Sequence, residues 1–137
     1  MRRLWLVSVV AIAGCGGSSD TRTNVPRPAP PVTMTAAVQD DVVRVSPRAV
    51  GAGEVTLIVS NQSERAQTVT FETDELGGAR AGTRASSPPI PAGSTGRLTL
   101  KVRQGTYSVH VASDAIRPAR VLVGPPRKSG QNDLLLP

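Results

Sequence analysis

The residues best able to act as nucleophile, base or metal ligand occur once each in this 137-residue chain, as Cys15 and His110. A thiol can be acylated, oxidised or bound to a metal, and an imidazole can carry a proton or bind a metal. Nucleophilic active sites and tight metal centres combine several such groups in one place. The elements that carry these two residues therefore decide which chemistry is open to them.

His110 lies between two valines in a stretch where polar and apolar residues alternate. Successive side chains of a strand point to opposite faces, so His110 should share a polar face with Ser108 and point to solvent. A catalytic set could be written from His110, Asp114 and either Ser108 or Ser113. However, no G-x-S-x-G elbow presents a serine nucleophile. We therefore predict that the protein is not an enzyme.

Three carboxylates, Glu72, Asp74 and Glu75, follow one another closely at the end of another expected strand. Carboxylate oxygens bind divalent cations, but this spacing does not match the EF-hand loop. The alternative is a solvated acidic loop, and we favour it. We predict no metal and no other cofactor.

Cys15 follows a start with two arginines and an uncharged run, residues 4–13. This layout is typical of a secretory signal, and the run is shorter than the roughly 20 apolar residues of a transmembrane helix. Residues 12–15, Ile-Ala-Gly-Cys, resemble the lipobox of bacterial lipoproteins. The resemblance implies a signal peptide over residues 1–14, cleavage between Gly14 and Cys15, and lipid, including acyl chains such as palmitate, on Cys15. The alternative is an ordinary signal peptide with a cysteine at its cleavage point.

This interpretation places the protein on the extracytoplasmic face of the cell membrane or outer membrane and makes the membrane its first partner. The formal net charge is +6, and loss of Arg2 and Arg3 with the signal would lower it to +4. Trp5 would leave too, so Phe71 and Tyr107 would be the remaining aromatic residues. Nucleic-acid binding through stacked bases is therefore not expected. The mild basic balance fits anionic lipid headgroups or cell-wall polymers better.

The chain divides by composition into a leader, a linker, one domain and a tail. Residues 15–34 are predicted to be the lipidated cysteine and a flexible, proline-rich linker. Residues 35–124 are enough for one small domain, and residues 125–137 are predicted to be a disordered tail. Because acylation of Cys15 would leave no thiol for a disulfide, a packed core must stabilise the domain.

Alternation of apolar and polar residues predicts an all-β Greek-key sandwich, and no window carries a helical pattern. The expected strands are residues 41–46, 54–60, 66–72, 95–102, 106–112 and 119–123. The proline-rich residues 86–93 should form a loop or a sheet edge, because proline cannot donate to a ladder.

Four short segments in this order resemble a cupredoxin-like domain. They are the opening pair of strands (residues 43–57), an asparagine turn (59–63), an Ile-Pro-Ala-Gly-Ser-Thr turn (90–95) and a Gly-Thr-Tyr strand start (105–107). Within this pattern we expect Tyr107 to be structural, with its hydroxyl bonded across a Greek-key corner as in immunoglobulin-type sandwiches. An immunoglobulin or fibronectin-type sandwich is the alternative, since alternation does not reveal strand order.

A blue-copper site needs two histidines, a cysteine thiolate and usually a weak axial methionine. The resemblance places the first histidine at Gln67, the cysteine at Val111 and the second histidine at Ile116, and no methionine follows Ile116. The sole methionine outside the leader, Met34, lies outside the pattern. The resemblance therefore implies a degenerate domain that does not bind copper.

From these features we expect a lipid-anchored binding or accessory module that engages an envelope protein or polymer. The loops over residues 62–65, 76–89 and 113–118 should form its functional end. The alternative is a copper-handling or electron-transfer lipoprotein.

Overall fold

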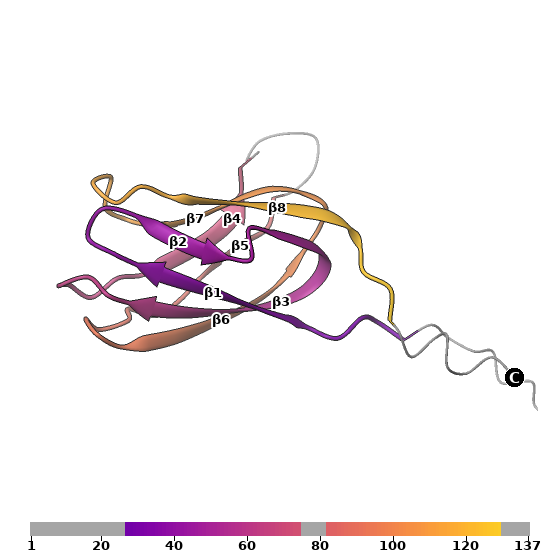
Figure 1. Cartoon of the computed structure of the whole chain (residues 1–137), viewed down its shortest axis with the longest axis horizontal. Helices are drawn as coiled ribbons and strands as arrows, with labels where there is room; N and C mark the ends of the chain where they lie inside the picture. Colours follow the sequence, from indigo (N-terminus) through magenta and orange to yellow (C-terminus); the bar gives the residue numbers. More distant parts are fainter. Residues whose placement is uncertain (1–26, 75–81, 130–137) are drawn as a thin grey trace, which may run out of the picture.

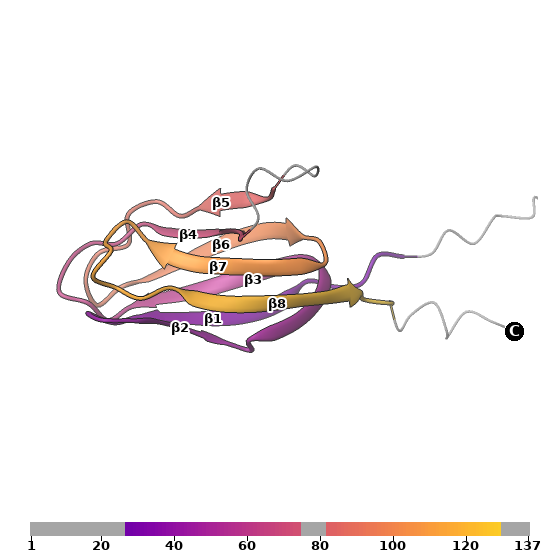
Figure 2. The ribbon, with the colours of Figure 1, turned by 90° about the horizontal axis from the view of Figure 1, so that it is seen from above.

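The computed structural model describes residues 27–74 and 82–129, and these ranges form strands and connections without a helix. Among these residues no helical segment has the length and hydropathy that crossing a bilayer requires. The strands are β1 (Val32–Val38), β2 (Val43–Ser46), β3 (Ala49–Asn61), β4 (Val69–Thr73), β5 (Arg84–Ser86), β6 (Thr95–Val102), β7 (Gly105–Val111) and β8 (Ala119–Pro126). They pack as the two layers of a sandwich (Figures 1 and 2).

Strand β3 belongs to both layers. Its first residues, 49–52, pair in parallel with β8, and residues 53–60 pair with β6. The register shifts between Gly51 and Ala52, and an irregularity of this kind bends a strand. One layer is therefore β2-β1-β3-β6, and the other is β8-β7-β4-β5 joined to the start of β3.

The core lies between the layers and is built from the apolar phase of each strand, as the alternation predicts. Phe71 and Tyr107 form its aromatic centre, with ring centroids 5.5 Å apart and planes at 84°. Around them pack mainly valine and leucine side chains, including Val55, Leu57, Val59, Val69, Val109, Val121 and Val123. The all-β sandwich expected from the sequence is thus the observed fold.

The sandwich begins earlier than the sequence indicates. Strand β1 starts at Val32, inside the segment predicted as linker, and Met34 is fully buried. Small residues at Ala36 and Ala37 give β1 a weak apolar signal, but its parallel pairing with β3 supplies the missing stabilisation. Strand β5 was also not predicted, because Arg84–Ser86 contains no strongly apolar residue.

The segment predicted as a disordered tail is in part packed against the domain. Strand β8 continues to Pro126, and the Arg127 guanidinium then donates to the carbonyl oxygens of Pro30, Ala52 and Glu54 at 2.9, 3.4 and 2.7 Å. Gly53, with φ of +141°, leaves room for this side chain, since a Cβ there would lie 2.7 Å from the Arg127 Nη2 atom. Residues 130–137 lie outside the described part of the chain.

The strand directions give the sandwich two distinct ends (Figure 1). At the terminal end β1 begins, β8 finishes, Arg127 binds its carbonyls and β6 turns into β7. At the loop end lie the β1–β2, β3–β4 and β7–β8 connections. Side chains that could form a site are found mainly at the loop end.

Candidate functional site

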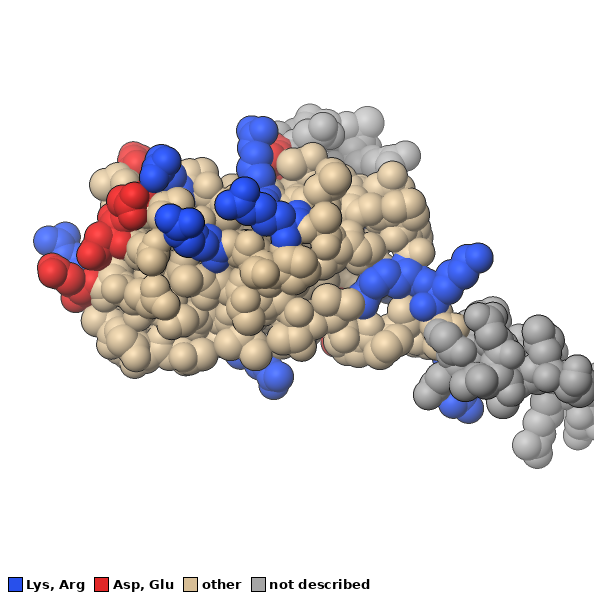
Figure 3. All heavy atoms as spheres, in the orientation of Figure 1, with Lys and Arg blue, Asp and Glu red and all other residues tan. Residues whose placement is uncertain are grey.

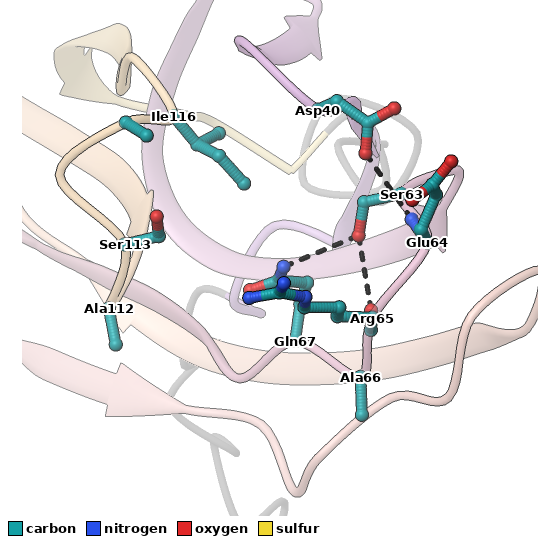
Figure 4. A pocket seen from close by; sticks show the side chains of 10 residues that line it. Asp40, Ser63, Glu64, Arg65, Ala66, Gln67, Ala112, Ser113 and Ile116 are labelled. Atoms are coloured by element: carbon teal, nitrogen blue, oxygen red, sulfur yellow. Dashed lines mark hydrogen bonds between the residues drawn. The ribbon is translucent and has the colours of Figure 1, made fainter.

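A pocket of about 750 Å³ opens at the loop end (Figure 4). The β1–β2 connection contributes Asp40, and the other two connections contribute two short runs of residues. The lining consists of Asp40, Ser63, Glu64, Arg65, Ala66, Gln67, Ala112, Ser113, Ala115 and Ile116. Charged and amide groups from one side therefore face small apolar groups and a serine from the other.

One buried amide holds the β3–β4 side of this pocket in place. Asn61 is 0% exposed, and its Nδ2 donates to the carbonyl oxygens of Arg65 and Ile90, both at 2.8 Å. Its Oδ1 accepts from the backbone N and the Oγ of Ser63, at 3.1 and 2.7 Å. A buried polar group satisfied in this way is costly to remove, so the loop has a defined shape.

The organising role of Asn61 was missed from the sequence, which indicated only a strand-ending turn. A signal was present, because an asparagine at the end of a strand often accepts a hydrogen bond from the backbone N–H two residues on, in an Asx turn. The contact with Ile90 could not be found in this way, since Ile90 comes from a distant loop.

The three positions singled out by the cupredoxin resemblance come together at this pocket. Gln67 lies in its wall, with Nε2 donating to the Ser63 Oγ at 3.3 Å, and Ile116 lies across from it (Figure 4). Val111 is buried directly before Ala112 of the lining. These positions carry an amide and two hydrocarbon side chains, so they do not fit a blue-copper ion, which needs imidazole and thiolate donors.

The remaining candidate copper donors lie elsewhere. Met34 is in the core on β1, and Cys15, together with Gly14 at the expected cleavage point, falls outside the described residues. Over residues 27–74 and 82–129, no three His, Cys, Asp or Glu side chains are grouped so that they could hold a metal ion.

His110 lies on the polar outer face of β7, as its phase predicts, but it is not a free surface residue. Its Nε2 lies 2.9 Å from the Glu72 Oε1, and the two side chains are 30% and 16% exposed. Glu72 also faces Arg84, whose Nε lies 3.3 Å from Oε2 without the alignment of a hydrogen bond. The outer face is the one predicted, whereas the pairing with Glu72 was not predicted, because it depends on the β4–β7 register that sets Glu72 diagonally beside His110.

The catalytic set around His110 and the acidic trio are the two other arrangements considered from the sequence, and their side chains have other partners in the structure. The described contacts of His110 are with Glu72 and the Val111 carbonyl oxygen, so it is not hydrogen-bonded to a serine or to Asp114. Of the acidic trio, Glu72 is paired with His110, and Asp74 lies 3.7 Å from the Arg120 Nε. Glu75 lies outside the described residues.

Tyr107 performs a structural task at the terminal end. Its hydroxyl oxygen accepts a hydrogen bond from the Arg103 backbone N at 2.9 Å. Arg103 lies in the connection by which the chain passes from β6 in one layer to β7 in the other. The hydroxyl therefore spans the corner between the layers.

Two of the three loops expected to form the functional end are at the pocket, and one is not. Residues 63–65 contribute to the lining, and so do Ser113, Ala115 and Ile116. Residues 76–89 run instead along the sandwich: Thr83 bonds to Thr73 toward the terminal end, and Ser87 bonds to Val69 nearer the pocket. Residues 75–81 lie outside the described part.

Comparisons with known proteins bear on the fold. No family model and no curated protein matches the sequence. Among solved structures, auracyanin A, a blue copper protein from the green thermophilic photosynthetic bacterium Chloroflexus aurantiacus, matches with a TM-score of 0.54 and 16% identity over 69% of this chain and 100% of that chain. The multicopper oxidase mgLAC matches with a TM-score of 0.44 and 17% identity over 71% of this chain and 39% of that one.

An oxidised mutant of amicyanin matches with a TM-score of 0.41 and 16% identity, over 67% of this chain and 80% of that one. The likeness to auracyanin A carries the conclusion about architecture. The chain has a cupredoxin-like β-sandwich, and the immunoglobulin alternative is set aside. At this level of identity the likeness concerns the fold alone.

Proposed function

We propose that this cupredoxin-like chain is a lipid-anchored, extracytoplasmic binding or accessory module that engages an envelope protein or polymer. In this proposal the domain neither binds copper nor catalyses a reaction. The pocket at the loop end is the contact region, and the lipid on Cys15 holds the opposite end near the membrane.

The observation that carries the proposal is the make-up of the pocket. Gln67 and Ile116 line it where the resemblance expects copper ligands, and neither carries an imidazole or a thiolate. The buried Asn61 amide keeps the loop between them and β3 in a defined shape. A preformed hollow that combines charged, amide and hydroxyl groups with small apolar side chains supports recognition of a polar partner surface.

The position of the pocket also favours this proposal. Strands β1 and β8 carry the chain between the terminal end and the loop end, so the linker side of the domain is far from the pocket. The linker from residue 16 to residue 29, just before the bound Pro30, could reach about 43 Å at the roughly 3.1 Å per residue of an extended proline-rich chain. An anchor at Cys15 would therefore leave the pocket accessible.

The alternative is a copper-handling or electron-transfer protein. The specific observation in its favour is the fold shared with auracyanin A, which is a blue copper protein. Against it, the single histidine is paired with Glu72 on the outer face, and the single cysteine would be acylated. Such a site would lack the donors that blue copper requires.

Photo-crosslinking in intact cells tests the contact region. A photoreactive amino acid replacing Ser113 should capture one defined partner, whereas the same group replacing Thr99, on the outer face of β6, should not. Equal capture from both positions, or capture from Thr99 alone, would contradict the role of the pocket.

Copper loading decides between the two functions. After exposure of the purified protein to Cu(I) or Cu(II) and dialysis, we expect no stoichiometric copper. Stoichiometric copper that survives dialysis would overturn the proposal, and its loss in a His110→Ala variant would identify the imidazole as one of its ligands. A serine-reactive probe should likewise leave the protein unlabelled, and labelling would point to a hydrolase.

A further inference from the structure

Charge is distributed unequally between the two ends of the sandwich. On the face seen in Figure 3 most acidic side chains lie at the loop end, whereas lysine and arginine side chains are spread along the molecule and include a group at the terminal end. The loop-end connections carry four carboxylates, Asp40, Asp41, Glu64 and Asp114, against two arginines, Arg65 and Arg117. Arg117 is paired with Asp41 at 3.1 Å. The loop end is therefore negative although the chain as a whole is positive.

The terminal end has the opposite character. Lys101 is the second-last residue of β6, and Arg103 directly follows this strand, two positions away. Lys128 directly follows Arg127, which binds the three carbonyl oxygens. All three side chains are exposed. Residues 53 and 54 of β3 lie between the end of β6 and the segment with Lys128. They pair with the end of β6, and Arg127 binds the Glu54 carbonyl oxygen. Within the described ranges these three cations form no salt bridge, and Glu54 is the one acidic residue beside them. We call Lys101, Arg103 and Lys128 the basic end.

The basic end lies where the linker enters the domain. Pro30 is bound directly by Arg127, so the segment that leads back toward Cys15 starts beside these cations. A lipid chain combined with a basic patch is a common means of holding a protein against an anionic membrane. Anionic headgroups attract cations only within about a Debye length, roughly 10 Å, so the basic end would have to approach the surface closely.

We propose that the basic end rests on anionic lipid headgroups of the membrane that holds the anchor. This inference depends on the proposed lipid anchoring. The long linker by itself permits many distances and orientations, whereas contact through the basic end selects one of them. The acidic loop end would be repelled by the same headgroups if it approached them, so the orientation in which the pocket points away from the membrane is favoured.

Vesicle binding of the full, non-acylated chain tests this inference without using the anchor. A Lys101→Gln, Arg103→Gln, Lys128→Gln variant is compared with a matched control, Arg44→Gln, Arg65→Gln, Arg97→Gln, which loses the same charge from exposed residues elsewhere. The uncharged run of residues 4–13 is present in both variants, so any vesicle binding that it causes is the same in both. Co-sedimentation is measured with phosphatidylcholine vesicles and with vesicles that also contain phosphatidylglycerol.

The phosphatidylglycerol-dependent part of the binding should fall about a hundredfold in the basic-end variant, at roughly fivefold per cation, and much less in the control. Added salt should remove the difference. An equal loss in both variants would show that net charge alone matters and would overturn the inference. So would unchanged binding of the basic-end variant.

A charge-preserving variant guards against effects on folding. Lys101→Arg, Arg103→Lys, Lys128→Arg should bind anionic vesicles as the unaltered chain does, and a loss as large as that of the glutamine variant would contradict an electrostatic contact. Failure of the anchor would appear separately, as absence of acyl label on Cys15. The two proposals can therefore fail independently.

Discussion

The two ends of the sandwich are each held together by one polar side chain, but with different results. At the loop end the buried Asn61 amide joins its own loop to Ile90, and a pocket stays open beside it. At the terminal end the Arg127 guanidinium fills the space over Gly53 and ties the linker side to β3. The loop end therefore presents an open surface on a loop of defined shape, while the terminal end is closed over the point where the linker side enters the domain.

The largest expected effect concerns the proposed lipid anchor on Cys15, which would attach the terminal end to the membrane. Under the proposed anchoring, Cys15→Ala should abolish incorporation of radiolabelled palmitate and release the protein from the membrane, because the variant lacks the thiol that would be acylated. The domain should unfold at the same temperature as before. Persistent palmitate label and firm membrane binding in this variant would contradict the lipid anchor.

Removal of the amide at the loop end should be the most destabilising of the three polar substitutions considered within the domain. Asn61→Ala leaves two carbonyl oxygens and the Ser63 groups without their partner, and we expect a loss of about 3 kcal/mol in the free energy of unfolding. Denaturant titration measures this loss. Gln62→Ala, at the exposed neighbouring position, is the control and should change stability little. Equal stability of the Asn61→Ala and Gln62→Ala variants would show that the Asn61 amide does not hold the loop end together.

Loss of the clamp at the terminal end should cost less, because Arg127 is partly exposed and water can replace some of its bonds. Arg127→Ala is expected to lower the free energy of unfolding by about 1–2 kcal/mol. It should also increase proteolysis of the chain near Pro30, whereas Arg97→Ala should do neither. Resistance to protease equal to that of the unaltered chain would show that the clamp does not hold the linker side.

The smallest effect is expected at the corner between the layers. Tyr107→Phe keeps the ring against Phe71 and removes the acceptor for the Arg103 N–H group, so about 1 kcal/mol should be lost. Hydrogen exchange at the Arg103 amide should quicken in this variant. An unchanged exchange rate would mean that the hydroxyl does not protect this corner.

The accuracy of the sequence-based predictions follows from how local each signal is. Strand β6 has the predicted bounds, residues 95–102, because Leu98, Leu100 and Val102 alternate with polar residues throughout. Strand β1 was not predicted, because its stabilisation comes from parallel pairing with β3, which lies elsewhere in the chain. The face of His110 was correct, but its pairing with Glu72 depends on the β4–β7 register.

The sequence by itself determined the phase of each strong strand and the inventory of donors, because alternation and residue type are local properties. It also determined that Gln67, Val111 and Ile116 cannot supply a thiolate or an imidazole, wherever the fold places them. Only the tertiary structure decided that Gln67 and Ile116 share a pocket, that Asn61 supports it and that Arg127 closes the opposite end. Each of these contacts joins segments far apart in the chain, and the pairing of strands, which no local pattern encodes, brings them together.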